Sequence, residues 1–525
     1  MRPMDPRTPA ILGTAAAVGV AGDVLLRGGS PGLGFGLWAW GALIVYLELS
    51  RRLNARFAPD ALLFAALAFL CSAFVLVRAS PVLAALNITA TLSATALLSL
   101  ETGTLPLRRV HFVGYVRGLA RVALQVIFGA FGPTLAVLTR ITSRSPATRS
   151  RSIPLIRGAV VTVPAFLVFA ILLTLADASF EQLVLDIIGI DAWTPVNHLL
   201  VVLSITLVFA GVFHGQMIAR ADRLAVTASA NRPDSIGLVE AGMLVGALDL
   251  LFATFVVLQI QHFFGGAETL AATPGLTAAE YARRGFFELV VVEALAVPIL
   301  LGAEAIMRGK TPRDVAAFRV LAGINLALLG GIAMSAAMRL LLYRSAFGLT
   351  ESRVYAGGVL VWLVAVLVAL AATVLIGRHE RFTFAAIASA FVVLLTLNAA
   401  NPDALIASTN LSRAAEHAGE RTSGTASAFD VAYNASLSAD AWPTLLDGLE
   451  SLNSRDGAQL VTTLRQRRSA GDTTDWRAWN LGRRRGERAL AVVEMPEFSP
   501  PIRRAHSEDS GHNEVPEPTG GLSWP

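Results

Sequence analysis

The sequence predicts an all-α fold, a polytopic helical membrane protein with a small helical domain near its C-terminal end. Of its 525 residues, 54% are hydrophobic and only 15% are charged, whereas soluble globular proteins carry about 25% charged residues. The apolar residues gather in runs of roughly 20, the length of a helix that crosses a ~30 Å hydrocarbon core. Arginine is concentrated in the connections between these runs.

The apolar runs predict about eleven transmembrane helices. The first is expected to be a retained anchor, because the preceding MRPMDPR has little net positive charge and a second run follows at once. The approximate limits of the runs are 9–27, 31–49, 58–77, 82–100, 154–177, 195–217, 237–264, 285–306, 316–341, 355–377 and 383–400.

Basic connections alternate with short or acidic ones, and this alternation predicts the orientation. Cytoplasmic loops of membrane proteins carry an excess of Lys and Arg. The basic connections therefore belong in the cytoplasm, the N-terminus is cytoplasmic, and an odd number of spans places the C-terminal tail outside. These connections are SRRLNARF (50–57), the segment 107–157, IARADR (218–223), MRGKTPRD (307–314) and GRHER (377–381).

The chain is expected to have five parts. Residues 1–100 contain the first four spans, 101–153 form a basic cytoplasmic connection, and 154–400 contain the core spans five to eleven. Residues 401–495 form a helical extramembrane tail, whose modest size favours packing against the membrane domain. Residues 496–525 are rich in Pro, Ser, Glu and Gly, which predicts disorder.

The basic connection contains a predicted amphipathic helix. In RRVHFVGYVRGLARVALQVIFGAF (108–131), arginines are interspersed with apolar residues at helical spacing. Such a helix lies in the headgroup layer with its arginines toward anionic lipid. Membrane lipids are therefore expected partners, whereas no recognition fold for nucleic acid is visible.

The segment EYARRGFFELVVVEALAVPILLGAE (280–304) places acidic residues inside a predicted span, where ionised carboxylates are costly. Glu280, Arg284 and Glu288 are spaced four apart and form one row on a helix, so Arg284 can satisfy Glu288 at the outer interface. Glu293 lies on another face, about 13–14 Å from Arg284 along the axis. This row therefore leaves Glu293 unexplained.

Asp249, in the preceding span, is the expected counterpart of Glu293. The two spans are antiparallel, and Asp249 lies about 18 Å from the cytoplasmic end, so both carboxyls reach a similar depth near the midplane. Two carboxyls facing each other there could share a proton or bind a cation. Alternatively, both are protonated or hydrogen-bonded to neighbouring groups. The intramembrane amides that could serve are Asn325, Asn398 and Asn87.

A second group of candidate residues is expected at the outer interface. Arg339 lies near the outer end of the ninth span, where it can extend to the interface or pair with Glu351 across the turn. The predicted charge cluster consists of Glu280, Arg283, Arg284, Glu288, Arg339, Glu351 and Arg353.

The remaining motifs exclude several kinds of site. Cys71 is the only cysteine, which rules out an intramolecular disulfide and a thiolate zinc cluster. No histidine pair has the i+3 or i+4 spacing of metal ligands. No metal, cofactor or catalytic residue is therefore predicted.

Several segments together resemble a bacterial membrane family of unknown function, domain of unknown function 4173, which is related to domain 4153. The most specific are YARRGFFEL (281–289) and NPDALIASTNLSR (401–413), and the resemblance covers roughly residues 150–490. It implies a bacterial inner-membrane protein of many spans, with no established activity. The other matching segments are 156–180, 338–356, 429–445 and 475–485.

Three function classes remain. A signalling, scaffold or envelope-assembly component ranks first, with the tail contacting envelope proteins. The alternative is a proton- or cation-coupled secondary transporter that works through Asp249 and Glu293. A membrane-embedded enzyme acting on a lipid-linked substrate at the outer charge cluster is least favoured, because no acid/base constellation lies on one loop.

Overall fold

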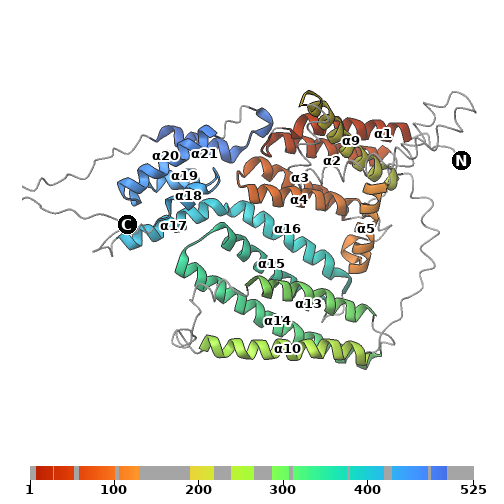
Figure 1. Ribbon diagram of the computed structural model, residues 1–525. Coiled ribbons are helices and arrows are strands. Elements are labelled where there is room, and N and C mark those ends of the chain that lie inside the picture. Colours follow the sequence, from red (N-terminus) through yellow and green to blue (C-terminus); the bar gives the residue numbers. More distant parts are fainter. Residues whose placement is uncertain are drawn as a thin grey trace, which may run out of the picture.

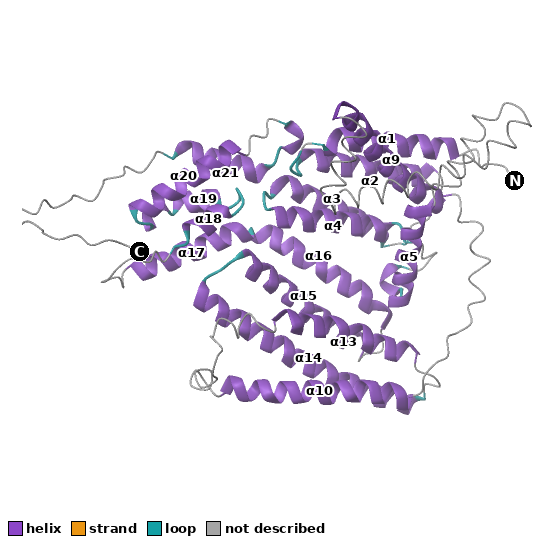
Figure 2. Ribbon diagram, in the orientation of Figure 1, coloured by secondary structure: helices purple, strands orange, loops and turns teal. Residues whose placement is uncertain are grey.

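The computed structural model describes a large part of the chain as helices joined by turns (Figure 2). Within these residues every regular element is helical, which confirms the predicted all-α fold. The described residues are 8–27, 29–52, 58, 60–100, 106–128, 190–217, 238–264, 286–306, 311–374, 379–418, 429–470 and 475–493.

The helices fall into three groups along the chain. The first comprises α1 (Thr8–Leu26), α2 (Leu33–Arg52), α3 (Ala61–Val77), α4 (Pro81–Leu98), η1 (Leu107–Arg109), α5 (Phe112–Phe128) and α9 (Ile190–Met217). The second comprises α10 (Leu238–Phe264), α13 (Phe286–Ile306), α14 (Pro312–Phe347), α15 (Glu351–Val374), η2 (His379–Arg381) and α16 (Phe382–Ala400). The third comprises α17 (Pro402–Ala418), α18 (Val431–Ser436), α19 (Trp442–Asp447), η3 (Leu449–Ser451), α20 (Ser454–Ala470), η4 (Trp476–Ala478) and α21 (Leu481–Val492).

The membrane class is confirmed by the length and hydropathy of these helices. Among the described residues, 7 helices are long and apolar enough to cross a membrane: α1, α2, α4, α10, α14, α15 and α16. The helices α3, α9 and α13 contain shorter apolar stretches. Every predicted span but one coincides with a helix; the exception, 154–177, lies outside the described residues, so the predicted number of eleven is not established.

The helix α14 extends beyond both predicted limits, 316 and 341, because its ends are fixed by local signals. Thr311 and Asp314 form a capping box at its start: the Thr311 side chain accepts from Asp314 N, and the Asp314 side chain accepts from Thr311 N. At its end Gly348 has φ 75°, a left-handed backbone conformation that favours glycine. A hydropathy profile detects neither the capping box nor the glycine at the helix end.

Two large hydrophobic cores lie among the membrane helices, and α16 contributes to both. One core joins α1 to α5, α9 and Phe391 of α16. The other joins α10, α13, α14, α15 and Phe382 of α16. In Figure 1, α16 accordingly runs between α4 on one side and α15 on the other.

The C-terminal helices form a separate domain with its own core, which includes Ile406, Leu445 and Leu460, all 0% exposed. Asn401, in the left-handed conformation with φ 52°, ends α16, and α17 begins at Pro402. The domain lies at one end of the membrane bundle, and α5 crosses the opposite end (Figure 1). The tail is thus packed against the spans.

Candidate functional site: polar groups inside the helical bundle

Asp249 of α10 and Asn325 of α14 form a buried polar pair. Asn325 Nδ2 donates to Asp249 Oδ1 at 2.7 Å, and the two residues are 1% and 8% exposed, respectively. Among the described residues, Asp249 Oδ2 and Asn325 Oδ1 have no hydrogen-bond partner. The pair therefore keeps one free acceptor on each side chain within the membrane domain.

Glu293 of α13 is more isolated. The residue is 1% exposed, and neither of its carboxyl oxygens has a hydrogen-bond partner among the described residues. Pro298 lies inside the same helix. Because proline has no N–H, the carbonyl of Ala294, which directly follows Glu293, lacks its usual helical donor. The helix α13 thus contains an unpaired carboxyl and, on the next residue, a backbone carbonyl without its helical donor.

The three polar residues lie on the inward faces of their helices. The residues one turn before and after Asp249, Glu293 and Asn325 belong to a single buried core. These flanking residues are Val245 and Phe252, Leu289 and Ala296, and Ala322 and Leu329.

The three residues also lie at a similar depth. A short connection joins α13 to α14, and the two helices pack against each other as an antiparallel pair. Glu293 and Asn325 are each about 20 Å from the helix end beside that connection, at the standard rise per residue. The hydrogen bond to Asn325 fixes Asp249 at this level. No hydrogen bond joins the Asp249 and Glu293 carboxyls.

The other two candidate amides, Asn87 and Asn398, form hydrogen bonds with each other and not with Asp249 or Glu293. Asn87 Nδ2 donates to Asn398 Oδ1 at 2.8 Å, and Asn398 Nδ2 donates to Asn87 Oδ1 at 3.0 Å. Both residues are 0% exposed. This reciprocal pair joins α4 to α16.

The predicted outer charge cluster is only partly described. Glu280, Arg283 and Arg284 lie outside the described residues, and so does the side chain of Glu288. Arg339, within α14, is only 7% exposed. Glu351 contacts the C-terminal domain, because its backbone N–H donates to Tyr433 Oη at 2.8 Å. Arg353 donates to the carbonyl of Gly348 within the α14–α15 turn.

Two residues of the C-terminal domain cap the ends of membrane helices that lie far away in the chain. Asp440 Oδ2 accepts the backbone N–H of Ala79 at 2.6 Å and that of Ser80 at 3.3 Å, at the start of α4. Asn480 Nδ2 donates to the carbonyls of Val75 and Arg78, both at 2.8 Å, at the end of α3. Helix ends leave such groups unsatisfied unless something caps them, so these contacts fix the domain to the bundle.

Two further carboxyls lie at this junction. Asp403 is 0% exposed, accepts a hydrogen bond from Ser438 Oγ, and shares a side-chain hydrogen bond with Glu351. Burial raises the pKa of Asp403, although the Ser438 hydroxyl opposes the shift. Burial likewise raises the pKa of Asp440 against the effect of the Ala79 amide. The junction therefore favours protons on its acids.

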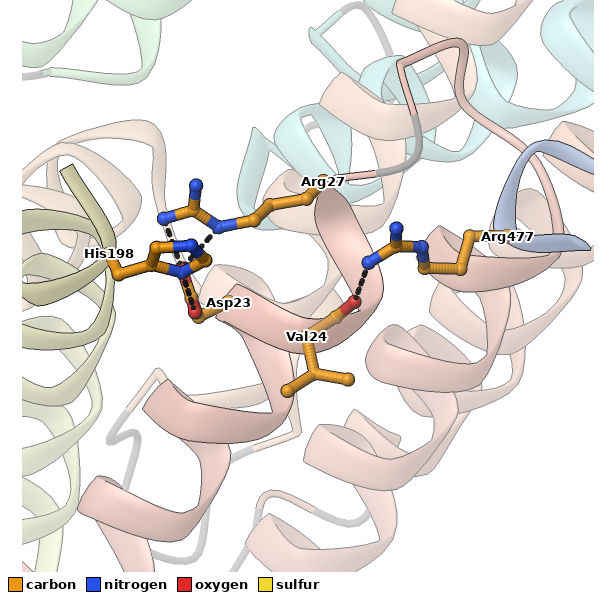
Figure 3. A network of polar contacts seen from close by, with 5 residues as sticks. All are labelled: Asp23, Val24, Arg27, His198 and Arg477. Carbon is orange, nitrogen blue, oxygen red and sulfur yellow. Dashed lines mark hydrogen bonds and ion pairs between the residues drawn. The ribbon is translucent and has the colours of Figure 1, made fainter. Parts of the chain in front are cut away.

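A third polar network lies where α1, α9 and the C-terminal domain meet (Figure 3). Asp23 Oδ2 lies 2.6 Å from His198 Nδ1, and Arg27 Nε donates to Asp23 Oδ1 at 2.6 Å. On the other side of the same helix end, Arg477 Nη1 donates to the carbonyl of Val24 at 2.7 Å. These contacts account for Asp23 as part of an ion pair, and they tie α9 to α1.

Comparison with protein-family models assigns the chain to a family. The family model described as Domain of unknown function (DUF4153) matches residues 63–448. The chain belongs to this family. The DUF4153 match includes the spans that carry Asp249, Glu293 and Asn325, whereas the relationship to domain 4173 stays a prediction. No curated protein and no solved structure matches the chain.

The sequence reasoning missed the residues of the junction. Asp440 and Asn480 act on helix ends more than 300 positions away in the chain, as their hydrogen bonds show. A weak signal was present, because ASPV (79–82) follows the third span and begins a helix with Ser80 and Pro81. That signal marks a helix start, but it does not reveal which distant side chain caps it.

Proposed function

We propose that this DUF4153 protein binds a proton at Glu293 and moves it through the membrane bundle, as a proton-coupled secondary transporter. The observation that carries the proposal is the buried Glu293 carboxyl, which has no hydrogen-bond partner among the described residues. Moving an unpaired ionised carboxylate from water into the bilayer interior costs on the order of several kcal/mol. A bound proton removes that cost.

The groups near Glu293 support reversible binding of a proton at this residue. In the same helix, Pro298 leaves the carbonyl of Ala294 as an acceptor without its helical N–H donor. The pair Asp249–Asn325 lies at a similar depth and offers two further acceptors, Asp249 Oδ2 and Asn325 Oδ1. Buried titratable groups inside membrane helices commonly mark ion and proton pathways. A purely structural position is better filled by an apolar residue.

The proposed orientation places the N-terminus in the cytoplasm and the C-terminal domain outside, in a bacterial inner membrane. Arg51 and Arg52 end α2, and the basic turns η1 and η2 pack against each other. The helix α2 begins against the C-terminal domain, where Leu33 N donates to the carbonyl of Trp479, so Arg51 and Arg52 lie at the far end of this helix. An excess of arginine is characteristic of the cytoplasmic side.

The experiment is proton flux in proteoliposomes that contain a trapped pH-sensitive dye and carry an imposed potassium diffusion potential. We expect flux above that of empty liposomes for the wild type and loss of most of it for Glu293→Gln, which keeps the shape but cannot carry the proton. Asn325→Leu should lower the flux through its effect on Asp249. The matched control is Glu416→Gln, the same change at an exposed position of α17.

Two results would overturn the proposal. One is wild-type flux equal to that of empty liposomes under both signs of the potential. The other is Glu293→Gln flux equal to that of the wild type. Infrared difference spectra between acidic and basic pH add a readout that does not depend on flux, because the wild type should show a carboxyl band that Glu293→Gln lacks.

A partner-binding role for the C-terminal domain is the second candidate. Its outward helices α20 and α21 carry exposed arginines, including Arg465, Arg484 and Arg488. Trp476 and Trp479 are 55% and 38% exposed. Crosslinking in cells tests this role: reproducible capture of one envelope protein by the wild type, weakened by Arg484→Glu with Arg488→Glu, is the expected result.

A further inference from the structure

An apolar cavity lies in the half of the membrane domain that does not contain Glu293. It has a volume of about 440 Å³ and is lined by α2, α4, α5 and α9. This volume falls within the range of about 300–1,000 Å³ that is typical of ligand pockets. Its walls include Trp38 and Tyr46 of α2, Thr95 and Ser99 of α4, Val122 of α5 and Phe209 of α9.

The cavity wall is apolar even where hydroxyl side chains line it. Thr91, Thr95 and Ser99 each donate to a carbonyl one turn back in α4, at 2.8, 2.8 and 2.9 Å. Their hydroxyl protons are therefore used within the helix, and the surface that remains is mainly hydrocarbon. Such a wall suits a hydrocarbon chain better than a polar solute.

The cavity is bounded by the amphipathic helix at one end of the bundle. Val122 and Val126 of α5 line the cavity. Gly211 brings α9 close to α5, because a Cβ there would lie 2.2 Å from the carbonyl oxygen of Gln125. The opposite face of α5 is apolar and open to lipid, as Val116 and Leu124 are 49% and 56% exposed.

Positive charge is carried by η1 and the first part of α5, which precede the cavity-lining residues Val122 and Val126 in the chain. Arg108 and Arg109 of η1 and Arg117 of α5 are exposed. The turn that carries Arg108 is held in place, because Asp60 accepts the backbone N–H groups of Leu107 and Arg108 at 2.5 and 2.9 Å. Arginines at this level of a membrane protein attract anionic headgroups.

We propose that this cavity holds an acyl chain of an anionic membrane phospholipid, whose phosphate lies beside Arg108, Arg109 and Arg117. The apolar wall binds the chain, and the arginines on the flanking turn and helix select the headgroup charge. The site is distinct from the Glu293 region, because the two are lined by different cores. The proposal stands whether or not the protein moves protons.

The test uses the full-length protein in vesicles of phosphatidylcholine that contain a small fraction of a phosphatidylglycerol probe with a photoreactive group in its acyl chain. After illumination, mass spectrometry maps the labelled peptides. We expect labels on α2, α4 and α9 at the cavity wall. Competition with unlabelled phosphatidylglycerol should remove them at least about tenfold more effectively than competition with phosphatidylcholine.

Matched variants on one helix test the cavity itself. Ala96→Phe adds a ring inside the cavity and should lower labelling about tenfold, whereas Ala85→Phe adds the same ring at an exposed position of α4 and should leave labelling unchanged. If Ala96→Phe is not monodisperse in size-exclusion chromatography, Ala42→Leu is the smaller cavity-filling change. Arg109→Gln with Arg117→Gln should abolish the headgroup preference.

Three outcomes would overturn the proposal: equal labelling of Ala96→Phe and the wild type, equal competition by both lipids, or labels that avoid the cavity wall. The occupant could instead be a segment of this chain. A crosslink from a cysteine placed at Ala96 to residues 154–177, in place of a lipid adduct, would establish that case and reject the lipid.

Discussion

The carboxylate of Asp440 accepts the backbone N–H of Ala79 at 2.6 Å, so a residue of the C-terminal domain caps the start of a membrane helix. Asn480 completes the arrangement at the end of the preceding helix α3 by donating to two carbonyls. Both residues are buried, at 8% and 2% exposed, respectively. The C-terminal domain is therefore part of the structure of the α3–α4 pair, and the two should gain or lose stability together.

Asp440→Ala should destabilise the folded protein by about 1–3 kcal/mol, because it removes a cap and leaves two buried N–H groups without their acceptor. Thermal unfolding in detergent should show a lower midpoint, and protease should release the C-terminal domain sooner. Asp447→Ala, at an exposed position of the same domain, is the control and should behave as the wild type. Equal protection of both variants would contradict the capping role.

The junction should be more stable at mildly acidic pH than at neutral pH. Burial raises the pKa of Asp403 in the folded protein, so the folded state holds its proton more tightly than the unfolded state does. The resulting stabilisation is fully present below the ordinary Asp pKa of about 3.9 and is lost as the pH rises through the raised value. Thermal midpoints measured over a pH series should fall over this range.

Asp403→Asn should flatten that pH dependence, because the amide does not titrate. Asp440 has a pKa shift of the same direction and remains in this variant, so a smaller slope should persist. Residues that face the pair from the packed elements, including Glu351, Tyr433 and Arg78, are unchanged in the comparison. An identical slope in Asp403→Asn and the wild type would assign the pH dependence to other groups.

The Asn87–Asn398 pair should show strong non-additivity. Asn87→Leu alone leaves the Asn398 amide without one of its partners inside the bundle, at a cost of about 1–3 kcal/mol. The double variant Asn87→Leu with Asn398→Leu removes both polar groups and should recover much of that loss. A double-mutant cycle on thermal stability measures the coupling, and strictly additive losses would show that the reciprocal bonds contribute little.

Glu293→Leu should make the protein more stable while it removes the proposed proton binding. Replacing an unpaired buried carboxyl by an apolar side chain removes a desolvation cost, and we expect a gain of about 1–3 kcal/mol. Glu416→Leu, at an exposed position, is the matched control. A loss of stability in Glu293→Leu would indicate that Glu293 has a structural partner.

The positions of the spans and the candidate acids were visible in the sequence, because both depend on local composition. Hydropathy over about 20 residues marks a span wherever it lies in the chain. Glu293 was identified because its own helix offers no counter-charge, and the structure leaves its carboxyl oxygens without hydrogen-bond partners among the described residues. The sequence predicted Glu293 as the counterpart of Asp249 and offered three amides as alternative partners, and helix packing was required to select Asn325.

The junction could not be predicted in the same way. Asp440 lies in a turn and Asn480 directly precedes a helix, positions whose sequence suggests only solvent-exposed polar groups or local caps. Their partners Ala79 and Val75 lie between α3 and α4 and in α3, far away in the chain. The sequence also gave no reason to join Asp23 to His198, which are 175 positions apart.

By itself, the sequence determined that this is an all-helical membrane protein, where most of its spans lie and which acids within them need explanation. These properties follow from the free-energy cost of placing polar groups in hydrocarbon, and that cost depends on the composition of each segment alone. Only the tertiary structure decided that the C-terminal domain caps α3 and α4, that Asn325 binds Asp249, and that four helices line an apolar cavity. Those contacts depend on which distant helices pack together, and hydropathy within a single segment does not specify that packing.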